Sequence, residues 1–224
     1  MKILTKVVVG SRLHGLETPK SDWDYRGVHI NSLKDTLSPF KRVKNTSWIE
    51  GDEDNTSYEL ADFCKNATKG NATILEVFFS DQVIETSPVA EEMRKNWKKF
   101  MDTNHFINAS RGYAHNQLNK MNLFEPDART PKFAVAYLRV LWQCAKFLET
   151  GEFHCKIDSK DVGIDLYEVK NAWRDDMAPE LSEHFVRMQA RITMAHKKAE
   201  ILTPDIKWIE EFIYDSYTTA SNSL

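Results

Sequence analysis

The sequence lacks the short motifs that mark many phosphoryl-transfer enzymes and hydrolases. It contains no HExxH, no GxxxxGK[ST], no GxSxG and no GxGxxG segment. These absences exclude several rival enzyme classes. Cysteine is also scarce: Cys64, Cys144 and Cys155 form no CxxC pair, so we expect no zinc site. Their small number indicates the reducing cytoplasm as the location.

Long apolar runs and an excess of positive charge are missing as well. No run approaches the ~18 apolar residues of a membrane-spanning helix, so we expect no membrane association. The net charge of −3 gives no overall attraction to nucleic acid, and any basic surface must therefore be local. With 224 residues of ordinary composition, the chain is long enough for one large domain or two small ones.

Residues 5–30 carry the most information. The β-branched run Lys6–Val9 ends at Gly10 and Ser11, which predicts a buried strand that enters a tight turn. A turn from a strand into a helix offers free N–H groups and the positive end of a helix dipole to a phosphate. Gly10 and Ser11 are therefore candidate ligands of nucleotide phosphates.

Two aspartates follow in a segment with apolar or aromatic residues at alternate positions. On a strand, Asp22 and Asp24 share one face, while Trp23 and Tyr25 share the other. Neighbouring carboxylates repel, so both stay ionised only when a cation lies between them. Hard oxygen ligands at this spacing suit Mg²⁺ or Mn²⁺. A phosphate-binding turn next to a carboxylate pair predicts metal-assisted phosphoryl or nucleotidyl transfer.

These residues resemble a known family. Gly-Ser, followed after a short gap by Asp-x-Asp on a strand, is the signature of the nucleotidyltransferases of the DNA polymerase beta superfamily. The run GSRLHGLETPKSDWDYRGV resembles one branch of it, the predicted nucleotidyltransferases found near bacterial RNA-repair genes and carried by many phages. The alternative is a hairpin with two solvated aspartates. The residues that carry the resemblance are Gly10, Ser11, Gly15, Ser21, Asp22, Asp24, Arg26 and Gly27.

The resemblance implies an enzyme of the EC 2.7.7 type, which transfers a nucleoside monophosphate from a nucleoside triphosphate to a hydroxyl and releases pyrophosphate. It implies two Mg²⁺ (or Mn²⁺) ions held by Asp22, Asp24 and a third carboxylate. In that branch an Asp stands four residues before the aromatic residue that begins the next helix, which indicates Asp54 before Tyr58. The alternatives for this third carboxylate are Asp52, Glu53 and Glu59.

Three basic residues are also expected at the nucleotide. Arg26 belongs to the motif itself. Lys132 and Arg139 lie seven residues apart on a helical pattern, and the branch carries basic residues near both positions. A plain solvated helix face is the alternative for these two. Glu76 is the one charge in an apolar stretch, and it is either a surface residue or the partner of a cation such as Arg26.

The periodicities predict an α+β fold in two parts. Residues 1–125 would hold a small mixed β-sheet nucleotidyltransferase core with flanking helices, and residues 126–224 a helical domain that closes one side of the cleft. A break at Pro126–Pro131 marks the boundary. Helices are expected from Ser57 to the stop at Gly70 and at 88–101, 105–121, 132–150, 165–174, 179–201 and 205–217.

The acceptor of the nucleotide is left open by the residues. An RNA 3′ end or a tRNA is favoured over a protein hydroxyl or a small molecule. Two other classes of function remain as alternatives. One is a toxin–antitoxin or phage-defence enzyme that modifies a protein, and the other is a catalytically inactive module that binds a nucleotide or RNA. The oligomeric state is not indicated.

Overall fold

The structure, a computed structural model, describes residues 1–41, 45–123 and 129–222. These residues form a five-stranded mixed sheet in the order β3-β4-β2-β1-β5. Strands β2 and β4 are parallel, and the other neighbouring pairs are antiparallel. The predicted α+β class with a small mixed sheet is therefore confirmed. The strands are β1 (Lys2–Val9), β2 (Trp23–Ile30), β3 (Thr46–Glu50), β4 (Glu53–Glu59) and β5 (Val83–Glu85).

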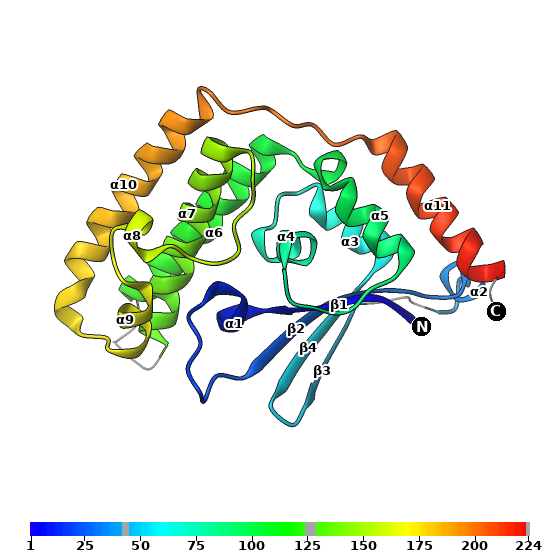
Figure 1. The fold of residues 1–224 in the computed structure, drawn as a ribbon, viewed down its shortest axis with the longest axis horizontal. Helices are drawn as coiled ribbons and strands as arrows, with labels where there is room; N and C mark the ends of the chain where they lie inside the picture. Colours follow the sequence, from blue (N-terminus) through cyan, green and yellow to red (C-terminus); the bar gives the residue numbers. More distant parts are fainter. Residues whose placement is uncertain (42–44, 124–128, 223–224) are drawn as a thin grey trace.

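Helices cover one side of the sheet and extend beyond its end (Figure 1). Helices α3, α4 and α5 lie over the sheet, and α6 to α10 form a separate group beside it. In the described residues, no helix combines the length and apolarity needed to cross a lipid bilayer. The helices are α1 (Gly10–His14), α2 (Leu33–Thr36), α3 (Leu60–Ala67), α4 (Ala72–Phe79), α5 (Pro88–Lys95), α6 (Thr103–Leu123), α7 (Thr130–Thr150), α8 (Ser159–Val162), α9 (Leu166–Asn171), α10 (Ala178–His196) and α11 (Ile206–Asn222), with short 3₁₀ turns η1 (Trp97–Phe100) and η2 (Asp175–Met177).

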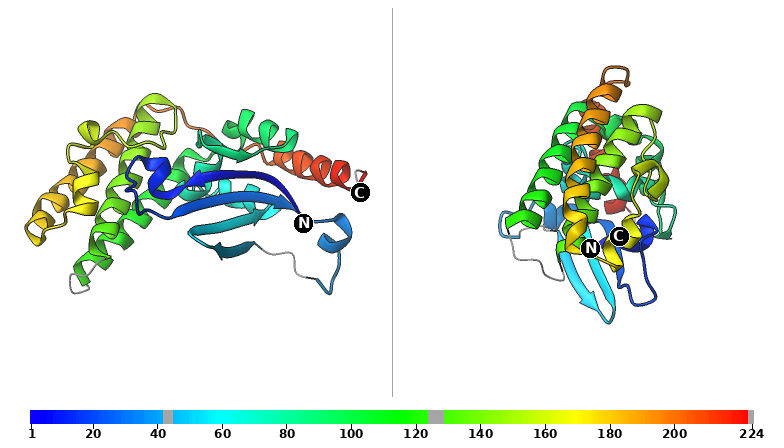
Figure 2. Two further views of the ribbon diagram at one scale, coloured as in Figure 1. Left: turned by 60° about the horizontal axis from the view of Figure 1, so that its bottom comes forward. Right: turned by 90° about the vertical axis from the view of Figure 1, so that its left-hand side faces the viewer.

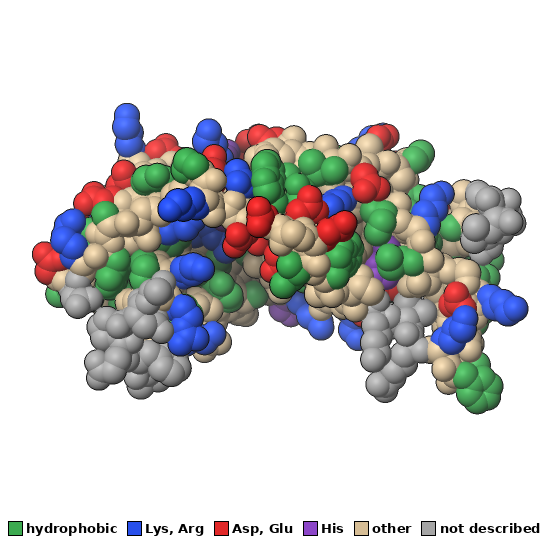
Figure 3. Space-filling view, turned by 90° about the horizontal axis from the view of Figure 1, so that it is seen from below, with side chains coloured by type: hydrophobic (Ala, Val, Ile, Leu, Met, Phe, Trp, Pro, Cys, Tyr) green, Lys and Arg blue, Asp and Glu red, His purple; other side chains and the backbone are tan. Residues whose placement is uncertain are grey.

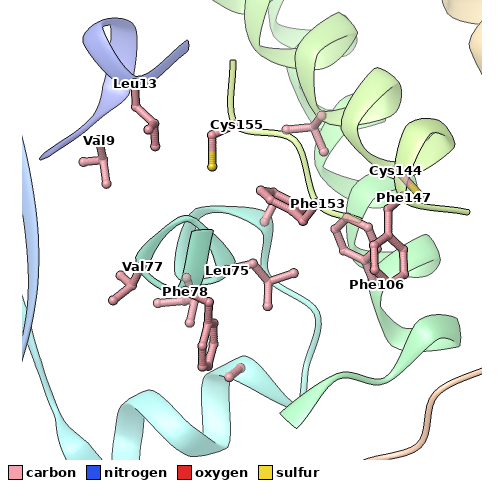
Figure 4. Packing of buried hydrophobic residues seen from close by; sticks show 14 of the residues in the cluster. Val9, Leu13, Leu75, Val77, Phe78, Phe106, Cys144, Phe147, Phe153 and Cys155 are labelled. Atoms are coloured by element: carbon pink, nitrogen blue, oxygen red, sulfur yellow. The ribbon is translucent and has the colours of Figure 1, made fainter. Parts of the chain in front are cut away.

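Buried aromatic rings join the sheet half to the helical half. The ring centroids of Phe79 on α4 and Phe153 lie 5.2 Å apart, and those of Phe106 on α6 and Phe147 on α7 lie 5.5 Å apart. Figure 4 shows Phe153 on the same side as Phe106 and Phe147, facing α4. One hydrophobic core therefore spans both halves. The expected domain boundary, between residues 125 and 126, lies outside the described residues.

The last helix returns to the sheet half. An extended segment runs from α10 to α11 along the edge of the molecule and brings the C-terminal end near the N-terminus (Figures 1 and 2). Helix α11 packs against η1, α2 and α3. Trp208 stacks on Phe212 with centroids 5.2 Å apart, and the Tyr217 hydroxyl donates to Glu59. The expectation of a helical domain over 126–224 did not anticipate this return.

The helix expected from Ser57 begins three residues later, at Leu60. Strand β4 continues through Glu59, because its pairing with β2 extends to that residue. The Glu59 side chain then accepts a hydrogen bond from the Ala61 N–H and caps α3. Strand pairing has thus overridden a local helical pattern, as tertiary context often does.

We predict that Gly70→Ala destabilises the protein far more than Gly51→Ala. Both glycines have positive φ, 67° and 60°, so alanine costs about 1 kcal/mol of backbone strain at either position. A Cβ on Gly70 would also lie 2.4 Å from the backbone of Phe106, whereas Gly51 has nothing within 4 Å. Overpacking against backbone should add at least ~2 kcal/mol. Urea unfolding of both variants measures this, and equal losses would contradict it.

Candidate active site

Three neighbouring strands bring the Gly-Ser turn and two aspartates to one edge of the sheet. Val9, the last residue of β1, pairs with Asp24 on β2, and Asp24 pairs with Asp54 on β4. Residues paired across neighbouring strands share a face of the sheet. Gly10 follows Val9 directly, so the turn and the two carboxylates form one row across three strands.

Gly10 approaches Asp24 more closely than another residue could. Its φ is +67°, and a Cβ at this position would lie 2.0 Å from Asp24 Oδ2. Any side chain here would displace the carboxylate and strain the backbone. Ser11 follows in the first turn of α1, which no side chain of the described residues caps. The predicted turn is therefore packed directly against the predicted carboxylate.

The charges around Asp24 are mutually repulsive. Partial burial raises the pKa of Asp24, and the carboxylates of Asp54 and Asp22 raise it further, while Arg26 opposes them. The ionised form of Asp24 is thus disfavoured by its surroundings. A divalent cation would relieve this repulsion, and the hard oxygen donors suit Mg²⁺ or Mn²⁺. Among the described residues, however, no three His, Cys, Asp or Glu side chains already stand as a metal-ligating group.

The four candidates for the third carboxylate occupy different positions. Asp54 pairs with Asp24 and acts on its pKa. Glu53 pairs with Trp23 instead, and its carboxylate lies 3.4 Å from Lys6 Nζ. Glu59 is buried at the far end of β4, where it caps α3. The remaining candidate, Asp52, accepts from the Trp23 N–H through its main-chain carbonyl.

Arg12 on α1 fixes the segment that leads into Asp22. Its Nε donates to the Asp22 carbonyl at 3.2 Å, and its Nη2 donates to the Ser21 carbonyl at 2.6 Å. Its guanidinium also lies 3.9 Å from the centre of the Trp23 ring. Trp23 in turn stacks on Tyr25, with centroids 6.1 Å apart, so the predicted sharing of a face by these two residues is confirmed. Sequence reasoning gave Arg12 no role.

Glu76 is the centre of a buried ion cluster. Of the two interpretations of this residue, the structure confirms the partner of a cation and not the surface residue. Its Oε1 lies 2.9 Å from Arg139 Nη1 and 3.3 Å from His14 Nε2, and its Oε2 lies 3.1 Å from Arg26 Nη1. Burial opposes ionisation, but these partners lower the pKa of Glu76 to about 2. The cluster joins α1, β2, α4 and α7.

Two of the expected nucleotide-binding residues therefore lie around Glu76. Arg26 donates to the main-chain carbonyl of Thr73 as well as to Glu76. Arg139 is buried and also donates to Gln143 Oε1 at 3.0 Å. These contacts connect the strand that carries Asp24 to α4 and α7.

A cavity of about 250 Å³ adjoins the ion cluster. Thr73, whose carbonyl accepts from Arg26, and Val140, next to Arg139, are among its lining residues. The cavity and the cluster are thus related through Thr73 and Val140, while His14 joins the cluster from α1.

Two basic residues of the helical half, Lys132 and Lys170, lie close enough for their charges to interact. Lys132 is exposed in the first turn of α7. Lys170 on α9 lies close enough for its charge to be affected by Lys132, Asp24 and Glu17. Sequence reasoning assigned a helix to this region but gave Lys170 no role, because nothing in the local pattern distinguishes it from a surface lysine.

Comparison with known proteins agrees with this geometry. Residues 1–168 match the model of a family described as RlaP, RNA repair pathway DNA polymerase beta family. The chain is also 27% identical to an uncharacterized protein of Methanocaldococcus jannaschii, in an alignment that covers 73% of this chain and 71% of that protein. That relative has no described activity, so it adds a likeness and no function.

We predict that Asp24→Asn stabilises the metal-free protein at neutral pH. The folded-state pKa of Asp24 is raised, so the folded protein is more stable when this side chain is protonated. That stability is lost as the pH rises through the folded-state pKa. Removing the charge should raise the free energy of unfolding at pH 7 by up to about 1 kcal/mol after solvent screening. Thermal unfolding in a chelating buffer measures the difference, which should vanish below the ordinary pKa of 3.8. Asp62→Asn, in the first turn of α3, is the control and should not stabilise.

We predict that Glu76→Gln costs about 3–5 kcal/mol of stability, because it leaves the buried Arg139 and the partly buried Arg26 without their counter-charge. The folded-state pKa is lowered to about 2 from an ordinary 4.5, so the stabilisation is present above pH 4.5 and is lost as the pH falls towards 2. Urea unfolding across this range tests both statements. Glu91→Gln, on the exposed surface of α5, is the control. A loss below 1 kcal/mol for Glu76→Gln would contradict the assignment.

Proposed function

Because the chain belongs to the RNA repair pathway DNA polymerase beta family, we propose that it is a metal-dependent nucleotidyltransferase. It would transfer a nucleoside monophosphate from a nucleoside triphosphate to a hydroxyl acceptor. The observation that carries this proposal is the row formed by Gly10, Asp24 and Asp54 across three paired strands. It sets a phosphate-binding turn directly against a carboxylate pair.

Asp22, Asp24 and Asp54 would hold Mg²⁺ or Mn²⁺. Their oxygens are hard donors, and the charges of Asp54 and Asp22, which add to the effect of burial in raising the pKa of Asp24, are ones that a cation would balance. When bound, such an ion supplies Lewis-acid activation of the phosphate and of the attacking hydroxyl. The carboxylates themselves contribute by fixing the place of the positive charge before the substrate binds.

The other residues would bind and orient the nucleotide. Gly10 and Ser11 would donate main-chain N–H groups to the phosphates, and Lys132 would add positive charge from α7. Arg26 and Arg139 would act from their places around Glu76, holding β2 and α7 in position. In the reaction, the acceptor oxygen bonds to the α-phosphorus, the bond from that phosphorus to the bridging oxygen breaks, and pyrophosphate leaves. The hydroxyl proton passes to solvent.

We propose an RNA 3′ end as the acceptor. The description of the family as part of an RNA repair pathway supports this choice. With a net charge of −3, the protein would bind RNA through local basic surface, to which Lys132 and Lys170 would contribute.

We predict that Asp22→Asn and Asp24→Asn each lower nucleotide transfer by roughly 10³-fold or more while the fold is retained, because each removes a ligand charge used in the transition state. The assay combines α-labelled triphosphates, Mg²⁺ and total RNA, with pyrophosphate release measured in parallel. Circular dichroism checks the fold, and Asp62→Asn serves as the active control.

Near-normal activity in either variant would overturn the site assignment. Label on a co-purifying protein instead of RNA would overturn the acceptor alone. Neither label transfer nor pyrophosphate release by the wild type would overturn the enzymatic proposal.

A further inference from the structure

Basic side chains from the helical half lie close to the acidic edge of the sheet. Seen from below, Lys and Arg side chains gather on the helical side, and acidic side chains occupy the neighbouring part of the same face (Figure 3). The fold itself places two basic residues of the helical half relative to each other, independently of this view. Lys132 lies in the first turn of α7, and Lys170 lies on α9, which packs against α7.

Lys170 reaches across to the loop after α1. Its Nζ donates to the Leu16 carbonyl at 2.8 Å, one residue beyond Gly15, which ends α1. Because α1 has only five residues and begins at Gly10, this contact places the ammonium near the Gly-Ser turn. The charge of Asp24 also acts on Lys170, in agreement with this position.

The two lysines disfavour each other. Partial burial lowers the pKa of Lys170, and the positive charge of Lys132 lowers it further, while Asp24 and Glu17 oppose the change. Within the described residues, neither lysine forms an ion pair with a carboxylate. An ammonium that is partly desolvated and next to a like charge is stabilised when an anion binds between the two.

We propose that Lys170, together with Lys132, binds the polyphosphate of the nucleotide substrate from the helical half of the cleft. This inference rests on the proposed function and extends it to a residue that the family match, which ends at residue 168, does not cover. A triphosphate carries several negative charges, and the neighbouring carboxylates add more. The two ammonium groups balance the part of this charge that lies away from the aspartates.

Lys170 could instead serve only as a tether between α9 and the Leu16 carbonyl. The two roles differ in what they require of the side chain. A tether needs a hydrogen-bond donor, which glutamine also provides, whereas polyphosphate binding needs a positive charge, which arginine also provides. Lys170→Gln and Lys170→Arg therefore separate the roles.

The test is calorimetric titration of inorganic tripolyphosphate into the full chain in Mg²⁺ buffer. We expect Lys170→Gln to bind about tenfold or more weakly than the wild type, with an unchanged melting temperature. Lys170→Arg should stay close to the wild type, and Lys197→Ala, at an exposed position at the end of α10, should not differ from it. The wild-type affinity should also fall more steeply with added salt than that of Lys170→Gln.

Equal binding by Lys170→Gln and the wild type overturns the inference and leaves the tether role. In the nucleotide-transfer assay, Lys170→Gln should raise KM for the triphosphate with little change in kcat, and an unchanged KM in an active wild type overturns this inference alone. If the wild type neither binds tripolyphosphate nor transfers nucleotide, the proposed function fails with it.

Discussion

The structure depends on the burial of one carboxylate. Glu76 is enclosed on α4, and a buried ionised group is tolerated only when charged and hydrogen-bonding partners surround it. Its partners come from three other elements: His14 on α1, Arg26 on β2 and Arg139 on α7. Each of these elements also carries a residue of the candidate site. Glu76 lies outside the site, but its need for charged partners holds the elements that carry the Gly-Ser turn, the aspartates and Lys132 in place relative to one another.

The charges of the candidate site are arranged differently from those around Glu76. Here like charges lie near one another instead of forming ion pairs with opposite charges. Partial burial and then the carboxylates of Asp54 and Asp22 raise the pKa of Asp24, and partial burial and then Lys132 lower the pKa of Lys170. The charged form of each group is therefore disfavoured by burial and by a like-charged neighbour. A substrate that brings a divalent cation to one side and a polyphosphate to the other relieves both. The near-neutral total charge of the chain conceals this separation.

What the sequence could predict was local. The alternation along β2 placed Asp24 and the Trp23–Tyr25 pair, because strand period alone decides which side chains share a face. Asp22 precedes the first residue of β2, so this rule does not reach it. The turn at Gly10 needed only its immediate neighbours. The role of Lys170 was out of reach, since its contact with Leu16 joins residues 154 positions apart. The return of α11 was equally hidden, because an amphipathic helix shows which face is buried but not which partner covers it.

The third carboxylate could be predicted from the sequence only in part. Asp52, Glu53 and Asp54 are consecutive, so composition alone leaves the choice open, and a shift of one residue in β4 would exchange the faces of Glu53 and Asp54. The parallel pairing with β2 favours the choice of Asp54, since it sets Glu53 beside Trp23 and Asp54 beside Asp24. Glu53 then meets Lys6 on the opposite face of the sheet, which gives the observed register a favourable ion pair. The register of one short strand therefore determines which acidic residue lies beside Asp24, and in this register β4 buries Asn55 and Ser57 on the face of Glu53.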